Sequence, residues 1–196
     1  IPVYQKIIKT AIAKKIIKDI KINNLHFVVS NHSEYHLDRS YISQETLDKY
    51  HFTRDYPLPD LNSATDWKLT KITIMGVTPE NENKITGMLR PYSEEIHFVT
   101  AQYGLKRAKS FYSIDITEKS ATKLSGLEKL LELYQLKKED TVVCGDGYND
   151  FPLLLAGGLK IAMGNAVPEL KQIADFVAPS VAEDGVAVVI EKFLKE

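Results

Sequence analysis

The sequence predicts an α/β fold with two parts: a small α+β domain at residues 1–112 and a parallel sheet covered by helices at residues 113–196. Strand-like and helix-like segments alternate strictly from about Ser113 onward, and short links join them. This arrangement is typical of parallel sheets with helices on their faces. Before that point, helices mix with strand patterns separated by turns, which is typical of an α+β domain.

Helices and short strands are expected in turn along the first region. An amphipathic helix is predicted at residues 4–22, because its isoleucines lie near helical spacing. A serine cap predicts a second helix at residues 43–50, and Pro79 suits the first turn of a third at residues 79–89. Strands are predicted at residues 25–30, 35–37, 69–75, 96–100 and 111–116, with a polar, proline-bearing connection at 55–66.

The second region repeats one unit, a strand followed by a helix. Strands are predicted at residues 113–116, 141–144, 160–162 and 176–178, and helices at 122–134, 151–156, 167–173 and 185–194. The strand at 141–144 reads TVVC without polar alternation, so we expect helices to bury both of its faces. In such sheets, ligands bind beyond the carboxyl ends of the strands.

Composition and charge exclude several classes of function. Apolar residues make up 44% of the 196 residues and charged residues 26%, as in ordinary soluble proteins. The net charge of −1 gives no basic surplus for a phosphate backbone, so no nucleic-acid partner is expected. No apolar run has the length to span a bilayer, so no membrane association is expected. The one cysteine, Cys144, excludes a disulfide framework and fits a cytoplasmic location.

The segment VVCGDGYNDFPLL, residues 142–154, places Asp146, Asn149 and Asp150 just past a predicted strand. Each acid has an ordinary structural interpretation, Asp146 as a turn residue and Asp150 as the N-cap of the next helix. Two carboxylates at one strand end also repel each other, and a hard cation such as Mg²⁺ relieves that repulsion. The pair therefore favours a Mg²⁺ site, and Mg²⁺ commonly accompanies phosphate.

Lys123 is a second candidate. It falls in the first turn of a predicted helix, where the helix dipole disfavours a cation by a few tenths of a kcal/mol. A solvated surface lysine tolerates that small penalty. A lysine at the same end of the sheet as Asp146 would instead face a bound phosphate. Its spacing in the sequence leaves both interpretations open.

Several motifs in order give the chain a resemblance to the haloacid dehalogenase (HAD) superfamily, in particular its Cof-type sugar-phosphate phosphatases. GDGYND resembles the metal-binding motif of that family, and ATKLSGLEKL resembles the motif with an essential lysine, at Lys123. AMGNA, ending at Ala166, and EDGVA, beginning at Glu183, match further landmarks. The resemblance is strong over residues 113–193, and several motifs in order are far more specific than one.

The resemblance implies a fold and a reaction. Residues 1–112 would form the α/β cap domain, and residues 113–196 the C-terminal part of the Rossmann-like HAD core. The reaction would remove phosphate from a small phosphorylated metabolite, such as a sugar phosphate, by way of an aspartyl phosphate. The cofactor would be Mg²⁺.

The resemblance also implies a role for each candidate residue. Lys123 would pair with the phosphate and with the attacking aspartate. Asp146 would bind Mg²⁺ directly, and Asp150 would complete or orient the metal shell. Asn149 would contact the phosphate or hold the loop.

The chain departs from the family's pattern at its start. The family's nucleophile and its acid/base partner lie in an N-terminal DxDGT motif, and this chain contains no Asp-x-Asp pair. Ile1 corresponds to the start of the cap, so the chain is expected to be a truncated, inactive form. Besides a phosphorylated metabolite, the expected partner is a second copy or a separate N-terminal fragment, at the open edge of strand 141–144.

The same residues also suggest two other functions. GDGYNDFPLL also resembles the phosphorylation-domain hinge of P-type ion pumps, but the lack of membrane helices and the EDGVA segment argue against a pump. The other alternative is a non-catalytic remnant of the fold that binds a phosphorylated ligand or a partner. A DxDGT motif directly ahead of Ile1 would indicate an enzyme, and its absence a remnant.

Overall fold

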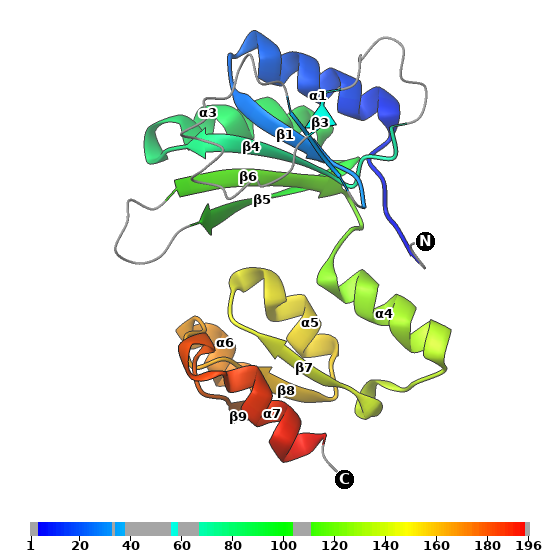
Figure 1. Cartoon of the computed structure of the whole chain (residues 1–196), viewed down its shortest axis with the longest axis vertical. Coiled ribbons are helices and arrows are strands. Elements are labelled where there is room, and N and C mark those ends of the chain that lie inside the picture. Colours follow the sequence, from blue (N-terminus) through cyan, green and yellow to red (C-terminus); the bar gives the residue numbers. More distant parts are fainter. Residues whose placement is uncertain (1–3, 33, 38–55, 59–66, 104–110, 195–196) are drawn as a thin grey trace. The chain divides into compact units, whose positions relative to one another are not determined.

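The computed structural model describes residues 4–32, 34–37, 56–58, 67–103 and 111–194. The chain forms two compact units, Ile1–Ala121 and Thr122–Glu196. Each unit has its own sheet (Figure 1). Each also has its own apolar core. The predicted α/β class is confirmed, with a largely antiparallel sheet in the first unit and a parallel sheet in the second. None of the helices in the described ranges is long and apolar enough to cross a membrane.

The described residues of the first unit form a six-stranded sheet in the order β3-β2-β1-β4-β6-β5. Its strands are β1 (His26–Ser30), β2 (Tyr35–Leu37), β3 (Tyr56–Pro57), β4 (Lys71–Val77), β5 (Ile96–Tyr103) and β6 (Phe111–Glu118). Neighbouring strands are antiparallel except β2 and β3, which are parallel. This unit is therefore of the α+β kind that the sequence predicts.

Two helices, α1 (Thr10–Ile22) and α3 (Pro79–Leu89), cover one face of this sheet (Figure 1). The inward stripe of α1 consists of Ala13, Ile16, Ile17 and Ile20, all 0% exposed. This spacing places the side chains on one face of a helix, and each buried isoleucine contributes about 2 kcal/mol of hydrophobic stabilisation. A short 3₁₀ turn, η1 (Arg90–Tyr92), follows α3.

The first helix starts later than the sequence predicts. The isoleucine spacing indicates a helix from Tyr4, but α1 begins at Thr10. The residues before it are not helical, because the Ile8 N–H donates to the Leu69 carbonyl at 2.8 Å and the Ile8 side chain is buried. A contact with a distant segment therefore overrides the local periodicity. The helix predicted at 43–50 and most of the connection at 55–66 lie outside the described residues.

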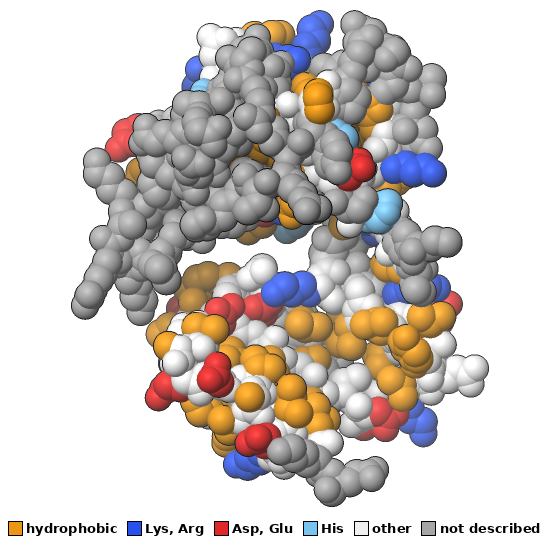
Figure 2. Space-filling model, viewed as in Figure 1, with side chains coloured by type: hydrophobic (Ala, Val, Ile, Leu, Met, Phe, Trp, Pro, Cys, Tyr) orange, Lys and Arg blue, Asp and Glu red, His pale blue; other side chains and the backbone are white. Residues whose placement is uncertain are grey.

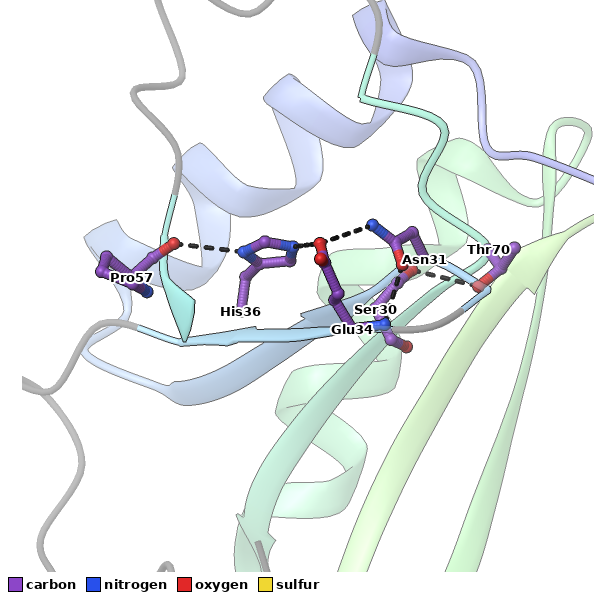
Figure 3. A network of polar contacts seen from close by, with 6 residues as sticks. All are labelled: Ser30, Asn31, Glu34, His36, Pro57 and Thr70. Carbon is purple, nitrogen blue, oxygen red and sulfur yellow. Dashed lines mark hydrogen bonds and ion pairs between the residues drawn. The ribbon is translucent and has the colours of Figure 1, made fainter. Parts of the chain in front are cut away.

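The β1–β2 connection is fixed by a small polar network (Figure 3). The Glu34 N–H donates to Asn31 Oδ1 at 2.9 Å, and Asn31 Nδ2 donates to Glu34 Oε2 at 3.3 Å. The His36 ring lies between the Glu34 carboxylate, at 3.3 Å, and the Pro57 carbonyl oxygen, at 3.2 Å. The network thus connects Glu34 to the short edge strand β3 through the His36 ring.

The predicted boundary after Tyr112 does not match the two units. β6 pairs with β5 from Phe111 opposite Tyr103 to Glu118 opposite Ile96, and it also pairs with β4. The segment 113–116 is therefore an internal strand of the first sheet, not the first strand of the parallel sheet, and the units divide after Ala121. Local alternation predicts a strand, but the partners that bury it lie elsewhere in the chain.

The second unit has the predicted alternation of strands and helices. Its strands β7 (Val142–Gly145), β8 (Leu159–Ala162) and β9 (Phe176–Val177) form a parallel sheet in the order β7-β8-β9. The helices are α4 (Lys123–Tyr134), α5 (Phe151–Ala156), α6 (Pro168–Ile173) and α7 (Gly185–Phe193). Short 3₁₀ turns are η2 (Lys138–Asp140), η3 (Tyr148–Asp150) and η4 (Val181–Glu183). Each α-helix contributes at least one side chain to the core, among them Leu127, Leu154, Leu170 and Val189.

Strand β7 is less covered than its apolar sequence predicts. Val143 and Gly145 are buried on one face, but Val142 and Cys144 on the other are only half-buried. Within the described residues β7 pairs with β8 alone, so one edge of β7 is open. Apolar side chains also reach the surface of this unit (Figure 2). Those on α4 and α7 include Leu130, Leu133, Tyr134, Val186 and Ile190.

Candidate functional site

The candidate site lies at the carboxyl end of β7, where ligands bind in parallel sheets. The chain leaves β7 at Gly145, passes through Asp146 and Gly147, and enters η3 and then α5. Gly145 allows a close approach at this point. A Cβ atom there would lie 2.5 Å from Cβ of Asp150 and 2.9 Å from Cδ1 of Leu154. The missing side chain therefore lets Asp150 fold back against the end of the strand.

Asp150 is the buried acid of the site, with a side chain only 1% exposed. Its Oδ2 accepts hydrogen bonds from the backbone N–H groups of Asp146, at 2.9 Å, and Gly147, at 3.2 Å. Its Oδ1 accepts a hydrogen bond from Nζ of Lys123. The side chain makes no capping hydrogen bond to α5. The simple structural interpretation expects the Asp150 side chain to cap α5. Instead, the side chain ties the β7 loop to Lys123 at the start of α4.

The charge state of Asp150 follows from these contacts. Burial raises the pKa of this carboxyl, but the Lys123 hydrogen bond, the two backbone N–H groups and the Lys123 charge together outweigh burial. The pKa therefore lies below its ordinary value, and the group is ionised at neutral pH. Both oxygens are engaged, so direct metal ligation by Asp150 would require one oxygen to give up or share a contact.

Lys123 is the first residue of α4 and pairs with Asp150 from 27 positions away. The preceding residue, Thr122, caps the helix: its side chain accepts a hydrogen bond from the Ser125 N–H at 3.1 Å. The ion pair offsets the unfavourable position of a cation at a helix N-terminus. Lys123 is therefore ion-paired rather than simply solvated, and its side chain is still 53% exposed.

Asp146 is exposed and is held by the next strand's loop. Its Oδ2 accepts a hydrogen bond from Nδ2 of Asn165 at 3.0 Å, and its carbonyl oxygen accepts one from the Val167 N–H at 3.0 Å. No hydrogen bond from a described residue reaches Oδ1 of Asp146. This carboxylate therefore keeps one oxygen available for a ligand.

Asn149 is exposed, and its side chain makes no hydrogen bond to the residues that the structure describes. Its neighbour Tyr148 stacks on Phe151, with ring centroids 6.1 Å apart, and its hydroxyl donates to Glu169 at 3.3 Å. The tyrosine thus anchors η3 on α6, while Asn149 lies at the surface of the same turn. Asn149 is available to a ligand, and it is not what holds the loop within the described residues.

The oxygen donors of the site meet part of the needs of a Mg²⁺ ion. Mg²⁺ takes about six oxygen ligands, often one or two carboxylates together with water and phosphate. The described residues contain no group of three or more His, Cys, Asp or Glu side chains that could hold a metal. The available oxygen of Asp146 suits a hard cation, with Asp150 behind it. The site therefore fits part of a Mg²⁺ shell, and the other ligands would have to come from water, phosphate or another polypeptide.

The structure brings Lys123 into contact with Asp150, which also holds the backbone of Asp146, and Asn165 joins them through its bond to Asp146. AMGNA is a landmark of the family resemblance, but no role for Asn165 was predicted from it. A usable signal exists, because Asn165 follows β8, and neighbouring parallel strands end at the same edge of a sheet. A polar residue just past β8 should therefore lie near those just past β7.

The family of the chain is shown by a family-wide comparison. The model of the haloacid dehalogenase-like hydrolases matches residues 2–190. Because the match covers nearly the whole chain, the chain belongs to the haloacid dehalogenase-like hydrolase family. The resemblance drawn from GDGYND and the other motifs is confirmed.

Similar curated proteins include several phosphatases. The putative phosphatase YkrA of Bacillus subtilis is 42% identical over 80 residues, which are 41% of this chain and 31% of YkrA. Phosphoglycolate phosphatase 1 of Saccharolobus solfataricus is 43% identical over 86 residues, 44% of this chain and 38% of that protein. The 5-amino-6-(5-phospho-D-ribitylamino)uracil phosphatase YitU of Bacillus subtilis is 28% identical over 163 residues, which are 78% of this chain and 58% of YitU. The matches thus span 31% to 58% of these relatives.

Solved structures share the fold along almost the whole chain. A haloacid dehalogenase-like hydrolase from Bacteroides thetaiotaomicron superposes with a TM-score of 0.78 at 21% identity, over 97% of this chain and 69% of its own. TM0651 from Thermotoga maritima superposes with a TM-score of 0.75 at 25% identity, over 99% of this chain and 70% of TM0651. The HAD subclass IIB sugar phosphatase BT4131 superposes with a TM-score of 0.71 at 21% identity, over 97% of this chain and 68% of BT4131.

Proposed function

We propose that the chain is part of a Mg²⁺-dependent, Cof-type phosphatase that acts on small phosphorylated metabolites such as sugar phosphates. The observation that carries the proposal is the cluster at the end of β7, where Lys123, with a half-exposed side chain, pairs with the Asp150 carboxylate that holds the loop of Asp146. A cation next to an available carboxylate suits a phosphate together with a divalent metal. The sugar-phosphatase and phosphoglycolate-phosphatase names among the similar proteins support the class of substrate.

Each residue would have a defined task in that reaction. Lys123, oriented by Asp150, would donate charge-assisted hydrogen bonds to a phosphoryl oxygen. Asn149, at the surface of the same loop, would contact the phosphate through its amide. Asp146 would bind the metal through its free oxygen, and a bound Mg²⁺ would neutralise developing charge on the phosphoryl group. In the family reaction an aspartate attacks phosphorus and the aspartyl phosphate is then hydrolysed.

The attacking aspartate of that reaction belongs to a DxDGT motif, which this sequence lacks, so we propose that the chain alone is inactive. There is no Asp-x-Asp pair in the sequence. Cys144 is a poor substitute, because burial raises the pKa of its thiol and keeps it protonated. The lack of an Asp-x-Asp pair also favours the second candidate function, a non-catalytic module that binds a phosphorylated ligand or partner.

We also propose that the open edge of β7 is a contact site for another polypeptide, either a second copy of the chain or a separate fragment that carries a strand. Within the described residues this edge carries no Pro, no charge and no bulge. Natural sheets commonly protect open edges with such devices, because unprotected edges pair with other strands.

The proposed ligands can be tested by binding rather than by turnover. Backbone amide shifts of ¹⁵N-labelled chain would be followed while MgCl₂, and then inorganic phosphate, are added. Both ligands should shift the amides of Asp146, Gly147 and Asn149, and phosphate should also shift those of Thr122 and Lys123. Shifts confined to other parts of the chain, or none at all with either ligand, would contradict the proposed site.

A further inference from the structure

Asn165 follows β8 and joins the loop after β7 to the segment after β9, the strands on either side of β8. Its Nδ2 donates to Oδ2 of Asp146 at 3.0 Å, and its Oδ1 accepts from the Val181 N–H at 3.0 Å. A backbone N–H can only donate and an ionised carboxylate can only accept, so the amide has one orientation that satisfies both contacts. A single side chain therefore connects the candidate metal ligand to the start of η4.

The loop around Asn165 is itself held firmly. Gly164 lets it approach the β9 loop, since a Cβ atom there would lie 2.7 Å from the Ser180 nitrogen. Nζ of Lys171 donates to the Gly164 carbonyl at 2.6 Å. On the other side, η4 is fixed by Glu183, whose carboxylate accepts hydrogen bonds from the Ser180 N–H at 3.0 Å and its hydroxyl at 2.6 Å. Asn165 thus extends from a fixed backbone, and the Val181 N–H that donates to it belongs to a fixed turn.

This contact holds the Asp146 carboxylate in one orientation, with one oxygen bonded and the other left for a ligand. Asp146 is exposed, and a free aspartate side chain rotates between two equivalent carboxylate orientations. With Oδ2 held by Asn165, Oδ1 is the oxygen left without a donor from the described residues. A neutral amide also preserves the full negative charge of the carboxylate, whereas a lysine in its place would compete with a metal ion for it.

We propose that Asn165 is a positioning residue: it fixes the Asp146 carboxylate so that Oδ1 is presented to a divalent cation, and Val181 in turn fixes Asn165. This inference rests on the proposed function, because it takes Asp146 as the metal ligand. Groups that orient a ligand typically change metal affinity by about 10- to 100-fold when they are removed.

Two variants separate positioning from loop anchoring. Asn165→Ala removes both hydrogen bonds. Val181→Pro removes only the N–H, at the exposed first residue of η4, where proline is well tolerated. Mg²⁺ affinity would be measured from the amide shifts of Asp146 and Gly147, and hydrogen exchange of the Val181 amide would be measured in parallel.

Asn165→Ala should weaken Mg²⁺ binding by about tenfold and accelerate exchange at Val181. Val181→Pro should weaken Mg²⁺ binding by a smaller factor, because the contact between Asn165 and Asp146 remains. Unchanged Mg²⁺ affinity in Asn165→Ala, with faster exchange at Val181, would make Asn165 a loop anchor only and overturn the inference. No Mg²⁺ shift at Asp146 in the unmodified chain would instead overturn the proposed function, and this inference with it.

Discussion

Nζ of Lys123 donates a hydrogen bond to Oδ1 of Asp150, across 27 positions of the chain. The Asp150 side chain is 1% exposed, while that of Lys123 is 53% exposed. The buried partner is also held by two backbone N–H groups of the β7 loop. The buried acid therefore holds the lysine in place, while about half of the lysine side chain stays exposed.

Asp150→Asn should lower the free energy of unfolding by about 2 kcal/mol, because hydrogen bonds to a buried charged group are lost or weakened. The matched control is Glu132→Gln on α4, which neutralises an acid that pairs with Lys129 but is 71% exposed. That change should stay within about 0.5 kcal/mol. Urea unfolding at pH 7 measures both, and equal losses in the two variants would contradict the role given to Asp150.

The stability due to Asp150 should depend on pH in one direction. Its pKa is lowered in the folded chain, so the unfolded chain takes up the proton at a higher pH than the folded chain does. The stabilisation is therefore complete above the ordinary Asp pKa of about 4, and it is lost as the pH falls through the lowered folded value. The difference in unfolding free energy between the unmodified chain and Asp150→Asn should shrink below about pH 4. A difference that stays constant down to the lowest pH measured would rule this out.

The chain alone should not turn over p-nitrophenyl phosphate in the presence of Mg²⁺, because it has no aspartate in a DxDGT motif to attack phosphorus. Release of p-nitrophenol by purified chain is the measurement. Asp146→Ala is the control for contamination, since a contaminating phosphatase would be unaffected by it. Sustained release that disappears in Asp146→Ala would reveal a nucleophile that the sequence does not identify.

Asp146→Asn and Lys123→Ala should affect different ligands. Asp146→Asn should abolish detectable Mg²⁺ binding, because the carboxylate charge is lost. Lys123→Ala should weaken inorganic phosphate binding by about tenfold or more, as expected for loss of a charge-assisted hydrogen bond, and should largely retain Mg²⁺. Titrations of both variants with both ligands test the assignment, and identical loss profiles would overturn it.

The open edge of β7 should make the chain self-associate, retain a separate fragment or unfold easily in its second unit. Native mass spectrometry gives the assembly, and hydrogen exchange compares the amides of residues 141–144 with those of β4, an internal strand. In a purely monomeric chain, the β7 amides should exchange faster than those of β4. A strict monomer with equal protection of both strands would show that this edge needs no partner.

Much of the second unit and its site could be predicted from the sequence. The helix at residues 151–156 has its predicted bounds, because Pro152 and the apolar residues after it favour a helix locally. The helix at 79–89 agrees in the same way, with Pro79 at its start. GDGYND and the lysine motif identify the family, because their spacing is a property of the sequence itself.

Only the tertiary structure decided how these elements are used. The start of α1 depends on the contact of Ile8 with Leu69, and the sheet to which β6 belongs depends on β4 and β5. The capping position of Asp150 is visible in the sequence, but its bond to Lys123 is not. The same holds for Asn165, which reaches Asp146 only because β7 and β8 are neighbours. Periodicity and capping act over a few residues, whereas these contacts join residues that are far apart in the chain and meet only when it folds.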